Sequence, residues 1–226
     1  MTPEFQYTFA FDVREAQDRD DLVVGPANAA AVAWVDRWPD WHPPGLVLIG
    51  PPAAGKSHIG AVWCRRSGAA RHPAARLHPA LEAARGGARA LLIEDVDGAA
   101  DEDSLFRLVN AMIEARGHLL VTCQRPPAQL GLRVPDLLSR LRAMQSVFLG
   151  QPDDELLGRV IKKQFGDRGV RVDNEVILFL LRRMQRSFVA ARRLVAELDA
   201  AALARRRKLT IPFVRAWFAD TVNRHA

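Results

Sequence analysis

Residues 50–57 read Gly-Pro-Pro-Ala-Ala-Gly-Lys-Ser, and this stretch decides the fold. It matches the phosphate-loop pattern Gly-x-x-x-x-Gly-Lys-Ser/Thr at every fixed position. An apolar run at 46–49 precedes it and a predicted helix at 56–66 follows, which is the strand–loop–helix order that the motif requires. Glycines let backbone N–H groups converge on phosphates, and the helix N-terminus adds its positive dipole end. The sequence therefore predicts a nucleotide site; the alternative, a chance turn before a helix, does not explain both spacing and context.

The motif assigns roles to its own residues. We expect the ammonium group of Lys56 to reach the outer phosphates and the Ser57 hydroxyl to hold Mg²⁺. The predicted nucleotide-binding residues of the loop and of the position after it are Gly50, Pro51, Pro52, Ala53, Ala54, Gly55, Lys56, Ser57 and His58.

A second apolar run, at 90–93, ends in two carboxylates, Glu94 and Asp95. Phosphate-loop proteins complete the Mg²⁺ shell with an acidic residue near a neighbouring strand end. We assign Glu94 to the metal, through a water molecule because its extra methylene moves the carboxylate outward, and Asp95 to the catalytic step. The alternative is a strand that simply ends in solvated carboxylates.

The remaining pattern predicts an α/β core followed by helices. Strands are expected at 46–49, 90–93, 119–123 and 146–149, alternating with helices at 26–38, 56–66, 102–116 and 135–142. Such alternation is typical of a mostly parallel sheet covered on both faces. The stretch 67–89, rich in Ala, Arg, Gly and Pro, gives no clear assignment. Beyond residue 150 we expect only helices, at 153–165, 173–184, 188–205 and 212–222.

Composition fits a soluble globular chain of 226 residues with 49% hydrophobic and 26% charged residues. No apolar run approaches the roughly 18–20 residues that span a bilayer. The first residues lack a signal-peptide pattern, and Cys64 and Cys123 alone make neither a disulfide framework nor a metal site. We therefore predict a cytoplasmic protein without a membrane partner. The net charge of +6 results from an arginine bias spread over the chain, so strong direct DNA binding is not expected.

Several blocks of the sequence resemble DnaA, the bacterial replication initiator, and more closely its shortened homologue Hda, the regulatory inactivator of DnaA. The shared blocks are Gly-Lys-Ser-His at 55–58, Leu-Leu-Ile-Glu-Asp at 91–95 and Val-Thr-Cys-Gln-Arg-Pro at 121–126. The long segments 125–141 and 207–215 favour Hda. The resemblance covers residues 5–222 and is weakest at 64–90. It implies an AAA+ phosphate-loop core at 15–150, a C-terminal α-helical lid at 151–226 and an N-terminal tail at 1–14.

The resemblance also implies roles outside the loop. Arg140 falls on the arginine finger, a cation offered in trans to the γ-phosphate of ATP on a neighbouring DnaA; by itself it would be a solvated surface residue. Thr122, or Cys123 beside it, falls on a sensor position, and the alternative is a buried polar residue satisfied by backbone. Val24 falls in the segment that lines the adenine pocket, unless that segment is only a docked linker. Ala190 stands where DnaA has a second sensor arginine, so intrinsic ATP hydrolysis is in doubt.

The N-terminal tail resembles a peptide that binds the DNA polymerase III beta sliding clamp. In it a glutamine leads and alternate apolar side chains fill a groove; the corresponding residues here are Gln6, Tyr7, Phe9 and Phe11. The alternative is a strand or staple packed on the chain's own core.

Together these features predict a regulator that binds ADP or ATP with Mg²⁺, tethers to the clamp on the nucleoid and stimulates hydrolysis of DnaA-bound ATP, which prevents re-initiation. A self-sufficient ATPase such as a helicase loader of the DnaC type is one alternative, and a replication adaptor with a purely structural nucleotide is another. The sequence leaves self-association open.

Overall fold

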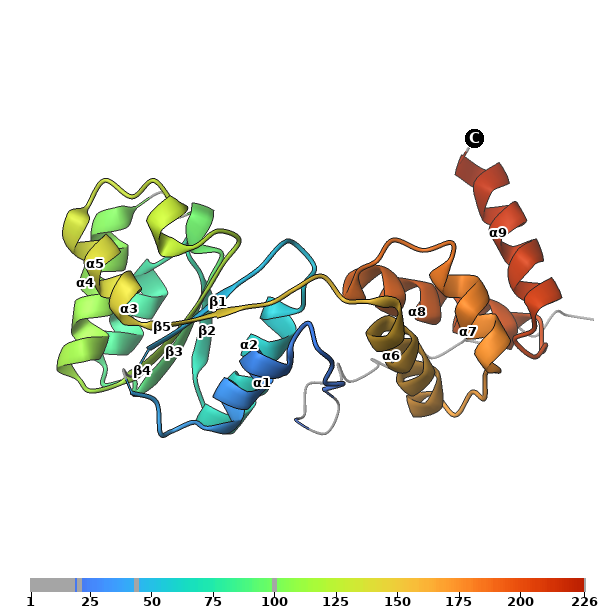
Figure 1. Cartoon of the computed structure of the whole chain (residues 1–226), viewed down its shortest axis with the longest axis horizontal. Helices are drawn as coiled ribbons and strands as arrows, with labels where there is room; N and C mark the ends of the chain where they lie inside the picture. The colour runs from blue at the N-terminus through green and yellow to red at the C-terminus, as the bar shows by residue number, and fades with distance from the viewer. Residues whose placement is uncertain (1–18, 20–21, 43–44, 99–100, 226) are drawn as a thin grey trace, which may run out of the picture.

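A computed structural model describes residues 19, 22–42, 45–98 and 101–225 of the chain. In this part of the chain, five strands form one parallel sheet in the order β2-β3-β4-β1-β5 (Figure 1). The strands are β1 (Gly45–Ile49), β2 (Ala70–Pro73), β3 (Ala90–Glu94), β4 (His118–Cys123) and β5 (Gln145–Phe148). Strands β1 and β3 are buried along their whole length, because a parallel sheet covered on both faces leaves no wet side.

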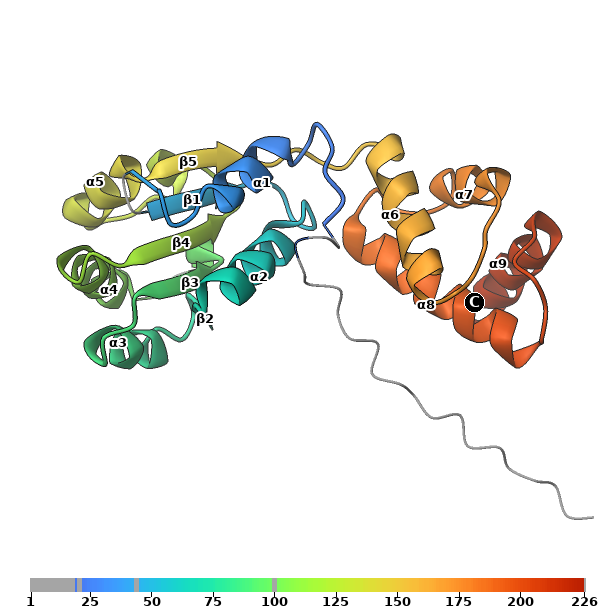
Figure 2. The ribbon, with the colours of Figure 1, turned by 90° about the horizontal axis from the view of Figure 1, so that it is seen from below.

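Helices cover the two faces of this sheet (Figure 2). Helices α3, α4 and α5 lie on one face and α1 and α2 on the other, and each face has its own apolar cluster. The helices of this unit are α1 (Ala29–Asp36), α2 (Lys56–Ser67), α3 (His78–Arg85), α4 (Glu102–Glu114) and α5 (Pro135–Ala143). Two single-turn 3-10 helices, η2 (Val96–Gly98) and η3 (Pro127–Gln129), follow β3 and β4.

A helical unit follows β5 and carries a third apolar cluster of its own. It consists of α6 (Asp154–Asp167), α7 (Asn174–Leu181), α8 (Phe188–Ala204) and α9 (Ile211–His225) (Figure 1). Asp153 caps α6 by accepting a 2.7 Å bond from the Leu156 amide, and Ser187 caps α8 by accepting a 3.1 Å bond from the Ala190 amide. Within the described ranges, no helix combines the length and apolar character needed to cross a membrane.

The sequence prediction of an α/β core with a mostly parallel sheet and a helical lid is confirmed. All four predicted strands are present, but the stretch 67–89 also contains β2 and α3, which the sequence did not reveal. The reason is the position of β2 at the sheet edge. Its residues are exposed or half-buried, so they need not be apolar, and no hydrophobic run marks the strand.

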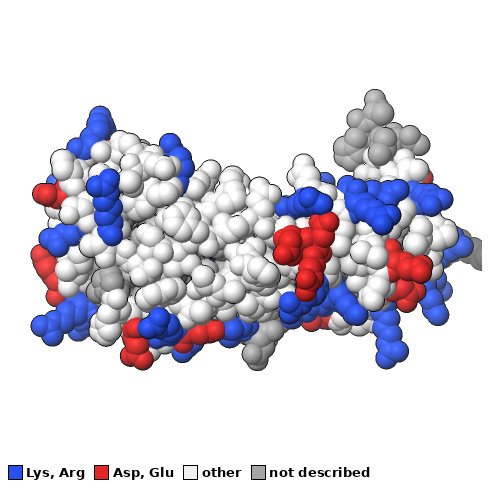
Figure 3. Space-filling model, viewed as in Figure 1, with Lys and Arg blue, Asp and Glu red and all other residues white. Residues whose placement is uncertain are grey.

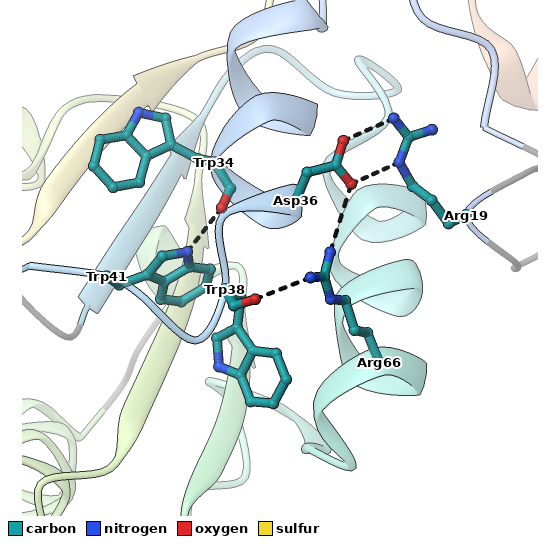
Figure 4. A network of polar contacts seen from close by, with 6 residues as sticks. All are labelled: Arg19, Trp34, Asp36, Trp38, Trp41 and Arg66. Atoms are coloured by element: carbon teal, nitrogen blue, oxygen red, sulfur yellow. Dashed lines mark hydrogen bonds and ion pairs between the residues drawn. The ribbon is translucent and has the colours of Figure 1, made fainter.

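Helix α1 is fixed to its surroundings by a polar network (Figure 4). Arg19 donates two hydrogen bonds of 2.7 Å to the carboxylate of Asp36, and Arg66 of α2 lies 3.8 Å from the same group. Arg66 also donates to the Trp38 carbonyl at 3.0 Å. Beneath the network, the rings of Trp41 and Trp63 stack with centroids 5.3 Å apart. The network joins the chain before α1 to the helix that follows the phosphate loop.

Charge is divided unevenly between the two units. Residues 151–226 contain 16 Lys and Arg against 9 Asp and Glu, whereas residues 1–150 contain 16 against 17. Figure 3 shows basic side chains on both units, acidic ones among them, and a largely uncharged surface across the middle of this face. Basic residues therefore occur in both units, as the sequence indicated, but the excess of basic over acidic residues lies in the helical unit.

Candidate nucleotide site

The predicted site residues meet at the carboxyl ends of β1, β3 and β4, where ligands bind in open parallel sheets. Ile49 is in register with Cys123, and Ile93 with Val121, so these three strands end side by side. The amide of Gly50 donates to the Cys123 carbonyl at 3.1 Å and ties the start of the phosphate loop to β4. Parallel pairing thus brings segments far apart in sequence to one edge of the sheet.

The phosphate loop makes two turns through left-handed backbone conformations. Ala53 has a φ of 60° and Gly55 a φ of 96°, and α2 begins directly after Gly55. Lys56 is only 7% exposed, and its Nζ donates to the carbonyls of Gly50 at 2.7 Å and Pro51 at 3.0 Å. Burial lowers the pKa of Lys56, while the carboxylates of Asp95 and Asp97 act in the opposite direction. The loop therefore concentrates an ammonium group and the N-terminus of α2 at one place.

The helical unit contacts this loop directly. A Cβ added at Gly55 would lie 3.1 Å from Cε2 of Phe188, the first residue of α8. Arg159 of α6 donates a 3.0 Å bond to the carbonyl of Val24, a half-buried residue of the predicted adenine pocket. Ser57 is exposed in the first turn of α2, and His58 after it is half-buried. A nucleotide on the loop would therefore lie beside residues from both units.

Thr122 has a backbone partner in this structure. It is fully buried, and its Oγ1 accepts a 3.0 Å bond from the amide of Asp95, whose φ is 56°. Asp95 itself is exposed beside the loop. Cys123 is also buried, and burial raises the pKa of its thiol to about 12, so at neutral pH it carries its proton. Thr122 therefore fixes the backbone that presents the Asp95 carboxylate.

Three residues of the site escaped the sequence analysis. Asp97 accepts hydrogen bonds from the amides of Gln124 at 2.6 Å and Arg125 at 3.3 Å, and so links the chain after β3 to the chain after β4. Phe188 covers Gly55 from the lid, and Arg71 of β2 forms an ion pair with Glu94. Each contact joins distant segments, so no local pattern marks it.

The residues present do not fit a metal held by Glu94. One carboxylate oxygen, Oε2, accepts from Nε of Arg71, and the other, Oε1, is covered by protein and has no hydrogen-bond partner among the described residues. Mg²⁺ in proteins keeps several of its waters, so its carboxylate ligands need an open face. Across the described ranges, no group of three or more His, Cys, Asp or Glu side chains is arranged to hold a metal ion.

Arg140 lies on α5 and is exposed, away from the strand ends that form the loop site. It has no ion-pair partner in the part of the chain that the structure describes, whereas Arg71, Arg125 and Arg133 of the same unit are all paired. The first turn of α8, next to the phosphate loop, carries Val189 and Ala190 in place of an arginine. The predicted clamp-binding residues Gln6, Tyr7, Phe9 and Phe11 lie outside the described residues.

The chain is similar in sequence and in structure to known proteins. Residues 154–218 match the family model of the Hda lid domain. Domain III of the replication initiation protein DnaA from Thermotoga maritima has a similar structure, with a TM-score of 0.75 at 16% identity over 91% of this chain and 97% of that one. AMPPCP-bound DnaA from Aquifex aeolicus has a TM-score of 0.68 at 17% identity, over 80% of this chain and 64% of that one. The RuvB branch migration motor from Thermotoga maritima has a TM-score of 0.62 at 17% identity, over 76% of this chain and 60% of that one.

The strand order, the phosphate loop and the helical unit behind it give the chain an AAA+ fold. Its helical unit matches the Hda lid domain over residues 154–218, and the fold as a whole is similar to that of DnaA domain III. It spans nearly all of DnaA domain III and less than two thirds of the longer DnaA and RuvB chains.

Proposed function

We propose that the chain regulates replication initiation by binding an adenine nucleotide and stimulating hydrolysis of ATP on DnaA. In this proposal residues 15–150 hold the nucleotide and residues 151–226 cover it. The tail at 1–14 tethers the protein to the DNA polymerase III beta clamp. The AMPPCP-bound DnaA structure, which has the same fold, supports an adenine nucleotide as the ligand. The resemblance of segment 125–141 to Hda selects Arg140 for the role in trans, and the observation that supports it is that Arg140 is exposed and has no ion-pair partner among the described residues.

The chemistry required of Arg140 is electrostatic. Phosphoryl transfer spreads charge over the oxygens of the γ-phosphate, and an arginine supplied by a neighbour stabilises that charge. A guanidinium that is exposed and has no carboxylate partner keeps its full charge available to another molecule. The chain's own nucleotide would then serve to fix the shape of the subunit that presents Arg140.

Replacement of Arg140 tests this role. The Arg140→Ala variant should lose DnaA-ATP hydrolysis in the presence of clamp-loaded DNA by at least about a thousandfold relative to wild type, the lower range of an arginine finger. Arg142→Ala, two residues along the same helix and equally exposed, is the matched control and should stimulate normally. Both variants should keep wild-type affinity for ADP. Normal stimulation by Arg140→Ala would remove the assignment.

A self-sufficient motor ATPase is the rival function, and Asp95 beside the loop favours it. It predicts steady ATP turnover by the purified chain, with or without single-stranded DNA, that Asp95→Asn abolishes. The proposal predicts no such turnover, because Val189 and Ala190 leave the first turn of α8 without a cation. If the chain is an adaptor whose nucleotide is purely structural, it should bind its partner, and replacing Arg140 should not change ATP hydrolysis by that partner.

A further inference from the structure

Glu94 is held by a side chain of the edge strand and not by the phosphate loop. Strands β2 and β3 run in parallel with Arg71 beside Leu92 and Pro73 beside Glu94. From this position the Arg71 Nε donates to Oε2 of Glu94, and the pair is an ion pair. The glutamate reaches back along the strand to this partner, and an aspartate, shorter by one methylene, would reach less far.

Burial leaves this carboxylate with little access to solvent, although it still acts electrostatically on Lys56 of the phosphate loop. Glu94 is 8% exposed, and its Oε1 has neither solvent access nor a hydrogen-bond partner among the described residues. A metal ion with its water shell would have to open this packing and displace the guanidinium. It would also meet the positive charge of Arg71 at close range. The ion pair and the metal are therefore mutually exclusive uses of Glu94.

What remains at the loop is sufficient to hold a polyphosphate. The backbone turns at Ala53 and Gly55, the N-terminus of the 12-residue helix α2 and the ammonium group of Lys56 converge there. Backbone N–H groups and a helix N-terminus bind phosphate without a metal. Asp95 is the exposed carboxylate beside them, and half-buried Asp97, whose oxygens accept from the amides of Gln124 and Arg125, is the other carboxylate that acts on Lys56.

We propose that Arg71 withdraws Glu94 from the metal site, so that the phosphate loop binds a nucleoside diphosphate with little dependence on Mg²⁺. This inference rests on the proposed nucleotide binding. It adds that the guanidinium of Arg71 pairs with Glu94 in place of a metal ion. Arg71 is a positioning residue: it acts through Glu94 and does not touch the nucleotide.

Titration of the full-length chain with ADP, in excess MgCl₂ and in EDTA, tests the inference. For wild type the two dissociation constants should differ by less than about tenfold, a step of 1.4 kcal/mol. Glu94→Gln should leave this ratio unchanged. Arg71→Gln frees the carboxylate, so Mg²⁺ should then tighten ADP binding by more than about tenfold. Arg76→Gln, an exposed arginine in the turn after β2, is the matched control and should behave as wild type.

Four outcomes contradict the inference. If wild type binds ADP only with Mg²⁺, the inference fails alone. If Glu94→Gln abolishes a Mg²⁺ effect, Glu94 is a metal ligand and the inference again fails alone. If Asp95→Asn abolishes a large Mg²⁺ effect, the metal has moved to Asp95 and the inference fails as well. If ADP binds in neither buffer, the proposed function falls together with it. Near-ultraviolet circular dichroism shows whether each variant is folded, and the wild-type ratio stands even if Arg71→Gln does not fold.

Discussion

Single residues of the phosphate loop are held in conformations that distinguish glycine from alanine. A left-handed backbone costs a non-glycine residue about 1–2 kcal/mol. Gly55 avoids this cost at a φ of 96°, and it also leaves room for the ring of Phe188. Ala53 bears the cost at a φ of 60°. Exchanging glycine and alanine should therefore matter more at position 55 than at position 53.

Gly55→Ala should lower the free energy of unfolding by more than about 1 kcal/mol and weaken ADP binding, because the new Cβ would lie 3.1 Å from Phe188 and the lid would have to move. Ala53→Gly, the matched control in the same loop, should change the free energy of unfolding by less than about 1 kcal/mol. Chemical denaturation and ADP titration measure both. Wild-type behaviour of Gly55→Ala would show that the lid does not rest on the loop.

At the residue scale the sequence predicted which side chains gather at the site but not what each one contacts. Lys56 and Asp95 follow from the loop motif and from parallel strands that end at one edge, whereas Thr122 was placed at the site only by the resemblance to DnaA and Hda. The partner of Glu94 did not follow, because Arg71 lies in the stretch that gave no assignment. The contact of Phe188 with Gly55 joins two units across more than half the chain, and no local pattern encodes it.

Among the elements, α1 is held in place by its last residue, Asp36, whose carboxylate interacts with Arg19 and Arg66. The Arg19 guanidinium, by donating to both oxygens, lowers the pKa of Asp36, with a smaller contribution from Arg66. A depressed carboxylate pKa contributes stability above the group's ordinary pKa, and this stability is lost as the pH falls through the folded value. Because the pair is partly exposed, its contribution is no more than about 1 kcal/mol.

Asp36→Asn should therefore reduce the free energy of unfolding by up to about 1 kcal/mol at neutral pH, and the difference from wild type should shrink in acid as Asp36 of the wild type takes up its proton. Urea denaturation at neutral and acidic pH measures this. Asp40→Asn, exposed four residues further on, is the control and should match wild type at both values. A difference that grows in acid would contradict the assignment.

Elements with a buried apolar face were predictable, and those without one were not. Strands β1, β3 and β4 each contain a run of buried side chains, and β5, in which only Val147 is buried, leads into buried Leu149. All four were expected near their observed bounds. Edge strand β2 has no such run. Helix α3 is short and alanine-rich, and only Ala80 and Ala84 of its residues are buried, so its apolar stripe is narrow. Tertiary contacts, and not local pattern, determine these two elements.

Over the whole molecule, the concentration of basic charge on the lid predicts a weak attraction to polyanions. Arg206 and Arg207 in the turn after α8 are exposed and have no carboxylate partner in the described residues. Binding through such charges releases counterions and is non-specific, with dissociation constants of about 10⁻⁴–10⁻⁶ M at physiological salt. The lid would then bind DNA weakly and without sequence specificity, in addition to the clamp binding proposed for the tail.

Fluorescence anisotropy with a duplex of random sequence, measured over a range of salt concentrations, tests this attraction. The variant Arg206→Ser, Arg207→Ser should bind more weakly, and the slope of log K against log salt should flatten by about 1–2. The variant Arg107→Ser, Arg116→Ser removes the same charge from the sheet unit and should bind as wild type. Equal losses in both variants would mean that net charge, and not the lid surface, governs the attraction.

The stacked indoles of Trp41 and Trp63 give the chain a built-in optical signature. Trp63 belongs to α2, whose first residue is Lys56 of the phosphate loop, and Trp41 precedes β1 on the other side of the stack. Two indoles in face-to-face contact respond to small changes in their relative orientation. A ligand that displaces α2 would alter their absorption and emission, so occupancy of the loop could be followed without attaching any dye.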